Sequence, residues 1–160
     1  MEAIAYYVHV HLAGAAAGID LFGRSGRAQT DREIGDVVLQ IREQLIDERR
    51  SLRAMADRLQ VGESSLLTWS ARAAERVGRL KPNGDLLRRT PLTDLVELEA
   101  MRDAVAGKIA GWQALLAVAD DYAGLDRAEL DVLLDQGEEQ HRRLTDAHAV
   151  VAARVLTREV

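Results

Sequence analysis

Apolar residues recur at steps of three and four along most of this chain, and this spacing restricts the fold more than any other feature. One stripe runs through Val38, Ile41, Leu45, Leu52, Met55 and Leu59. Such steps place side chains on one face of an α-helix, whereas a half-buried strand would need alternation. No segment alternates convincingly, because even "YYVHVHL" continues into an Ala-rich run. The pattern predicts an all-α chain.

Turn and capping residues divide this pattern into four long helices and one short helix. We expect the first helix to break at "GRSGRAQT", 23–30. A capping box, Thr30-x-x-Glu33, opens the second helix, which Gly62 ends. A short helix is expected from Ser64 to Leu80, before "KPNG".

The last two long helices have equally clear signals. Thr90 with Pro91 opens one helix, which Gly124 ends, and Asp126-x-x-Glu129 opens the last. Their apolar stripes are Leu95, Leu98, Met101, Val105, Ile109, Trp112 and Leu116, then Leu130, Leu133, Leu134, Gly137, His141, Leu144, His148, Val151 and Val155. Short connections predict an antiparallel four-helix bundle with one additional short helix between the second and third long helices.

Composition limits the possible classes of protein. The 160 residues suggest one domain, 1–160, with a sizeable core. The absence of Cys excludes disulfides and thiolate chemistry and fits a cytoplasmic location. A net charge of -5 argues against nucleic acid and anionic membranes. The uncharged start of the chain predicts a buried first helix rather than a membrane span, because His9 and His11 interrupt it and its first charge is Glu2.

Two helices carry ridges of small residues. They are Ala13, Gly14, Ala17 and Gly18 in the first helix, and Ala100, Ala104, Gly107, Ala110 and Gly111 in the fourth predicted helix. Glycine inside a helix costs up to about 1 kcal/mol relative to alanine, and close backbone approach is the usual compensation. We expect these ridges to pack on each other or on a partner subunit.

Polar residues that interrupt the stripes are the candidate functional residues. Glu48 fills the gap between Leu45 and Leu52, and a buried carboxylate needs a partner. His141 and His148 lie in the last stripe, two helical turns apart, so they cannot share one metal ion.

Pairing the last two helices antiparallel predicts two contacts between them. Glu99 is placed near His148, and Lys108 near Glu138. A Lys or Arg head among the inward carboxylates would replace a metal site with a salt-bridge network. Arg102 is the first candidate for that head.

Glu138-x-x-His141, with one polar residue on each long helix, resembles the ferritin-like superfamily. Its di-iron members take one Glu from each of two helices and Glu-x-x-His from each of the others. The resemblance implies metal ligands at Glu48, Glu99, Glu138 and His141, for iron or manganese. The chain departs from that set where Ser51 follows Glu48 in place of His, and its first helix lacks a central Glu. "HLAGAAAGIDLF" and "VGRLKPNG" are similar to an uncharacterised bacterial branch of ferritin-like proteins.

Three functions remain open at this point. The leading one is a non-catalytic bundle that acts as a homo-oligomer, such as a dimer, or as a partner-binding protein. The alternative is a metal-binding ferritin-like protein. The third is a DNA-binding regulator, because "MADRLQVGESSLLTW", 55–69, resembles a helix-turn-helix, although Gln60 occupies its turn and 63–69 has no Lys or Arg. No nucleophile elbow, phosphate loop or dinucleotide fingerprint indicates an enzyme.

Overall fold

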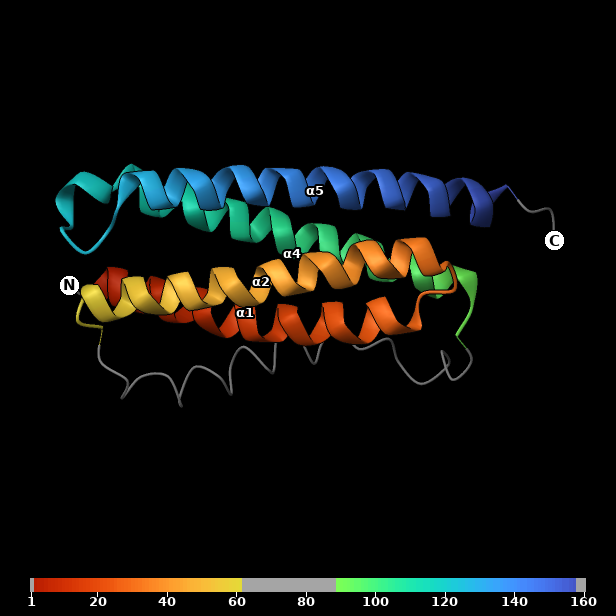
Figure 1. The fold of residues 1–160 in the computed structure, drawn as a ribbon, viewed down its shortest axis with the longest axis horizontal. Coiled ribbons are helices and arrows are strands. Elements are labelled where there is room, and N and C mark those ends of the chain that lie inside the picture. Colours follow the sequence, from red (N-terminus) through yellow and green to blue (C-terminus); the bar gives the residue numbers. More distant parts are fainter. Residues whose placement is uncertain (1, 62–88, 158–160) are drawn as a thin grey trace.

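Four long helices account for most of the described chain (Figure 1). The computed structural model describes residues 2–61 and 89–157. The elements are α1 (Glu2–Ala28), α2 (Arg32–Arg58), α4 (Pro91–Ala117), the short 3-10 helix η2 (Ala119–Asp121) and α5 (Arg127–Leu156). These residues contain no strand, which confirms the all-α prediction. The predicted short helix from Ser64 to Leu80 lies outside the described residues.

The helices pack as two hairpins whose long axes follow the length of the molecule (Figure 1). α1 packs most extensively on α2, and α4 on α5, while α1 also meets α4 and α2 meets α5. At one end, the Arg58 guanidinium donates from Nε to the Gly124 carbonyl at 2.9 Å and pairs with Glu129 at 2.6 Å. At the other end, the Thr30 N–H donates to the Asp94 carboxylate at 3.0 Å. The chain therefore leaves α2 at one end of the molecule and enters α4 at the other.

Helix starts follow the predicted capping pattern with one change of residue. Asp126 caps α5 and accepts from the backbone N–H groups of residues 128 and 129. Thr90 precedes α4 as predicted, and its N–H donates to Thr93 Oγ1 at 3.1 Å. The prediction of Thr30 as the cap of α2 was wrong, because the carboxylate of Asp31 accepts from the first turn instead. The backbone N–H of Thr30 donates to Asp94, and the next residue, Asp31, caps α2.

The first helix ends within the predicted stretch 23–30, but only at Ala28, because α1 continues through Gly23 and Gly26. Gly23 and Gly26 are buried within the helix rather than at its end. A Cβ on Gly26 would lie 2.9 Å from Leu39 Cγ, and one on Gly23 would lie 2.8 Å from Arg42 Nε. These glycines therefore allow α2 to approach α1 closely, and the packing outweighs their low helix propensity.

Two further helix ends also differ from the prediction. α2 ends at Arg58 rather than at Gly62, and Gln60 takes the left-handed conformation with φ 55°. α4 ends at Ala117 rather than at Gly124. A Cβ on Gly124 would lie 2.9 Å from the Arg58 carbonyl carbon, so this glycine lets the loop approach α2 and does not terminate a helix.

The predicted apolar stripes form the core in α2 and α4. Every member of the α2 stripe is buried except Leu59, which packs against the core at its edge. The core has two clusters along the molecule. One includes Leu12, Met55, Trp112 and Leu130, and the other includes Phe22, Ile41, Met101 and Leu144.

The small-residue ridges do not pack on each other as predicted. Gly111 is the only ridge glycine with a close neighbour among the described residues, where the His11 imidazole lies over it. No described atom comes within 4 Å of a Cβ built on Gly14, Gly18 or Gly107. Packing of this surface on a partner subunit remains a prediction. None of the helices in the described ranges has the length and hydropathy that a membrane span requires.

Candidate functional site

Three polar side chains from three helices meet inside the molecule, and we call Glu48, Lys108 and Gln140 the polar layer. Lys108 Nζ donates to Glu48 Oε2 at 2.5 Å and also to Gln140 Oε1. Gln140 Nε2 donates to Glu48 Oε1 at 2.7 Å and to Gln44 Oε1 at 3.1 Å. The three residues therefore form a closed ring of hydrogen bonds that joins α2, α4 and α5.

The polar layer lies inside because its members occupy core positions of the helical repeat. In each helix the buried positions alternate steps of three and four, as a packed helix face requires. The buried or half-buried runs are Ile41, Leu45, Glu48 and Leu52 in α2, then Met101, Val105, Lys108 and Trp112 in α4, then Gly137, Gln140, Leu144 and Ala147 in α5.

Burial makes the complete pairing of this layer necessary. The Glu48 side chain is 3% exposed and that of Lys108 is 17% exposed. Burial lowers the pKa of the Lys108 ammonium, and the Glu48 carboxylate opposes that shift. Both carboxylate oxygens of Glu48 accept a hydrogen bond, so its buried charge is matched by a charge and by an amide.

Gly137 provides room for the lysine to reach the ring. A Cβ at this position would lie 3.5 Å from Lys108 Cε and 3.1 Å from Ile109 Cγ1. The glycine in the middle of α5 is therefore explained by side-chain packing across the α4–α5 pair.

Glu99 and His148 pair as predicted, although not in the interior. Glu99 Oε1 and His148 Nε2 are 3.1 Å apart, which confirms the predicted partnership between α4 and α5. The pair lies at the surface, because Glu99 is exposed and His148 is half-buried.

The remaining predicted ligands face outward or lie beside the core. Glu138 is exposed and His141 is half-buried, whereas Gln140 takes the core position between them. The predicted Lys108–Glu138 pair was wrong for the same reason. Residue 140, rather than residue 141, lies on the buried face of α5. A difference of one residue corresponds to a rotation of about 100° about the helix axis.

The structure does not gather Glu48, Glu99, Glu138 and His141 at one point. Across residues 2–61 and 89–157, no three or more acidic or His side chains form a group that could hold a metal ion. The cationic head beside Glu48 belongs to Lys108 and not to the predicted Arg102.

Lys108 and Gln140 were not identified as partners of Glu48 from the sequence, although a signal was present. Gln140 lies three residues after Gly137 and four before Leu144. Lys108 lies three residues after Val105 and four before Trp112. Steps of three and four fit both residues, but they fit the neighbouring Ile109 and His141 equally well, so this signal does not choose between them.

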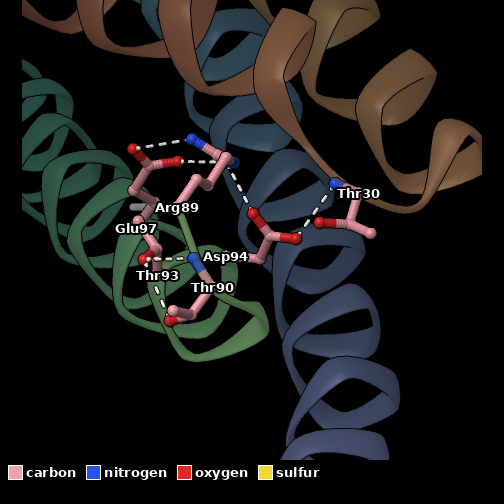
Figure 2. Close-up of polar contacts among 6 residues, drawn as sticks. All are labelled: Thr30, Arg89, Thr90, Thr93, Asp94 and Glu97. Atoms are coloured by element: carbon pink, nitrogen blue, oxygen red, sulfur yellow. Dashed lines mark hydrogen bonds and ion pairs between the residues drawn. The ribbon is translucent and has the colours of Figure 1, made fainter. Parts of the chain in front are cut away.

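A second polar cluster ties the start of α4 to the connection between α1 and α2 (Figure 2). Asp94 is buried and accepts from Arg89 at 2.6 Å, in addition to the Thr30 N–H. Arg89 also donates to Glu97 at 2.8 Å. Figure 2 shows the arginine between the two carboxylates, so its charge is shared by both. These bonds hold one end of the two hairpins together.

The two histidines of α1 have structural surroundings. His9 is buried, and its Nδ1 lies 2.8 Å from the Ala5 carbonyl, to which it donates. His11 is half-buried with its ring centroid 4.6 Å from that of Tyr7. Burial lowers the pKa of the His11 imidazole.

Of the stretch that resembles a helix-turn-helix, only residues 55–61 lie within the described part of the chain. Met55 and Ala56 are buried in the core of the long helices, and Leu59 and Val61 pack against it. These apolar side chains therefore serve the four-helix core, and the rest of the stretch lies outside the described residues.

The geometry of the polar layer suits cohesion between helices rather than chemistry on a substrate, because its acid and its base already bond to each other.

Comparisons with protein-family models, with curated proteins and with solved structures found no match for this chain.

Proposed function

We propose that this chain is a ferritin-like antiparallel four-helix bundle that acts without catalysis of its own, as a homodimer formed through one apolar face. The observation that carries the proposal is an exposed apolar surface on α1 and α4, which is uncharged over the first half of α1 and carries Glu99 and Asp103 on α4. The paired state of the polar layer supports it, because no observation in the described residues favours the metal-binding alternative.

The connectivity supports the ferritin-like architecture. Two hairpins are joined by a connection that begins at one end of the helices and returns at the other. Ferritin-like bundles have one such long crossover, whereas a simple up-down bundle has only short loops.

The proposed interface, which we call the α1–α4 face, combines the first half of α1 with the outer side of α4. No charged residue occurs in α1 between Glu2 and Asp20, and Tyr6 is 50% exposed. Contact between His11 and Gly111 brings this half of α1 beside the second half of α4. The exposed apolar members are Ala3, Tyr6, Val10 and Gly14 on α1, with Leu92, Val96, Ala104, Ala106, Gly107, Ala110, Ala114 and Ala117 on α4.

Charge favours the α1–α4 face over α5 as the contact between two copies. Each chain carries a net charge of -5, so two copies repel each other over most of their surfaces. The exposed side of α5, by contrast, carries Asp131, Asp135, Glu138, Glu139 and Arg142. The α1 side of the α1–α4 face carries no charge, whereas its α4 side includes the exposed Glu99 and Asp103. Two copies can therefore approach through this face with fewer opposing charges than through α5, and a two-fold axis lets one face meet itself.

The size of the face supports a reversible dimer. α4 has 27 residues and spans about 40 Å, and the uncharged half of α1 spans about 22 Å. With about 10 Å of width per helix, each copy would bury on the order of 600 Å². The total of about 1,200 Å² reaches the lower limit of specific interfaces.

Sedimentation velocity over a range of concentrations tests the proposal. The wild type should show a dimer that dissociates on dilution, whereas Val10→Glu and Ala110→Glu should be monomeric with unchanged helical content. Val132→Glu is the matched control, because this valine is 65% exposed on α5, away from the α1–α4 face. A wild type that stays monomeric up to about 100 µM would remove the dimer, since specific interfaces of this size bind more tightly.

A further inference from the structure

We propose that the polar layer fixes the register between the α1–α2 hairpin and the α4–α5 hairpin. Glu48 belongs to the first hairpin, whereas Lys108 and Gln140 belong to the second. Every bond that Glu48 makes in the ring therefore crosses from one hairpin to the other. This inference concerns a single chain and is independent of the proposed dimer.

The apolar pattern of α2 and α5 does not by itself distinguish neighbouring registers, so the polar layer acts together with the contacts of Gly111 with His11 and of Gly124 with Arg58. A shift of α2 along α5 by seven residues, about 10.5 Å, leaves apolar residues facing apolar residues nearly everywhere. A short connection sets the register within each hairpin, because only residues 29–31 separate α1 from α2. No short connection does so between the hairpins, since α2 ends at Arg58 and α4 begins at Pro91.

The polar layer penalises the shifted registers. After a seven-residue shift, Glu48 would face Leu133 or Ala147 in place of Gln140, and Gln140 would face Ile41 or Met55. The carboxylate and the amide would each lose a buried partner, and an unpaired buried polar group is costly. A single buried polar residue sets the register of coiled coils by the same principle.

Chemical cross-linking can test the register, because the chain has no Cys and introduced thiols are unambiguous. Arg143 Nη2 donates to Gln40 Oε1 at 2.8 Å across the two hairpins. The native reporter is therefore Gln40→Cys with Arg143→Cys. The shifted reporter is Gln40→Cys with Val150→Cys, seven residues further along α5. A thiol cross-linker shorter than about 10 Å separates the two registers.

Each reporter is placed in two backgrounds, the natural layer and the triple variant Glu48→Leu, Lys108→Met, Gln140→Leu. With the natural layer, the native reporter should link about tenfold faster or more than the shifted one. In the triple variant the two rates should approach each other. The cross-linking reaction is run at low protein concentration to favour links within one chain. The products are separated by mass under denaturing, non-reducing conditions, and only links within one chain are counted.

An unchanged rate ratio in the triple variant would overturn the proposal, because apolar packing would then suffice to set the register. If circular dichroism shows that the triple variant is not helical, Glu48→Met with Lys108→Met replaces it and is judged by the same ratio. Arg142→Leu, which removes a cation from the surface of α5 only, is the control and should keep the natural ratio.

Discussion

Replacing Lys108 by Met should destabilise the fold by about 3 kcal/mol at neutral pH, because it removes the cation that Glu48 binds. Removal of one partner from a buried ion pair costs about 3–5 kcal/mol, and the partial exposure of Lys108 argues for the lower end of that range. The amide of Gln140 would remain on one carboxylate oxygen, which is not enough to balance a charge in a side chain that is 3% exposed.

Urea unfolding followed by circular dichroism at fixed protein concentration measures this effect. With a slope of about 2 kcal/mol per molar urea, a loss of 3 kcal/mol lowers the midpoint by about 1.5 M. Adding Glu48→Leu to Lys108→Met should recover most of the loss, because apolar replacement of a whole buried pair is often neutral or stabilising. The double variant also separates the cost of an unpaired charge from that of lost packing.

Arg142→Met is the matched control. Arg142 pairs with Glu139 and Asp146 on α5, and all three side chains are exposed. Such surface pairs contribute about 0–1 kcal/mol, so this midpoint should hardly move. A Lys108→Met midpoint within the range of the Arg142→Met control would refute the reasoning, since Glu48 would then not depend on a cation.

Four further predictions concern other parts of the molecule. Gly111→Ala should destabilise by about 1–3 kcal/mol in urea unfolding, because its Cβ would lie 2.5 Å from the His11 ring, whereas Gly107→Ala at an open position should stabilise by up to about 1 kcal/mol. Burial lowers the pKa of His11 below 6.5, so its contribution is complete above that pH and is lost as the pH falls through the folded-state pKa. The urea midpoint of His11→Gln should therefore depend less on acidification, and an unchanged slope would contradict this. Asp94→Ala should cost about 1–3 kcal/mol, because it leaves the Thr30 N–H without its acceptor, and faster amide exchange there would report the loss. Protein purified without chelators should hold less than about a tenth of an equivalent of iron, manganese or zinc by elemental analysis, and stoichiometric metal would contradict the account of Glu48.

The sequence predicts the helical class and the inner face of α2 correctly, because both depend on local spacing. Asp126 and Thr90 were also found, since capping uses only neighbouring residues. The helix ends that were assigned to glycines were not predicted correctly from such local signals. Gly23 and Gly26 serve contacts with α2, and a single sequence does not tell a glycine that packs from one that terminates a helix.

The centre of the site was predicted only in part, because α5 offers two nearly equivalent stripes. His141 and Gln140 are adjacent, and both extend an apolar repeat to Leu144. The apolar repeat of α2 is compatible with a single buried face, so Glu48 was correctly predicted to be buried. Whether Lys108 and Gln140 face Glu48 depends on how α4 and α5 are rotated about their axes. Tertiary packing selects that rotation. Helical periodicity alone does not decide which of two adjacent residues faces the core.

The charge at the centre of the molecule connects its interior with its proposed function. In a ferritin-like di-iron site, inward carboxylates are balanced by bound metal. In this chain the balancing cation is the ammonium of Lys108, which α4 carries and which cannot dissociate. A polar layer neutralised in this way needs no ligand to be stable. Its hydrogen bonds connect α2, α4 and α5 to one another. Recognition of another molecule is then left to the exterior, where the α1–α4 face is extensive and mostly apolar, with Glu99 and Asp103 as exposed charges on α4. The interior lysine and the exterior face therefore support the same proposal, a bundle whose function lies in association.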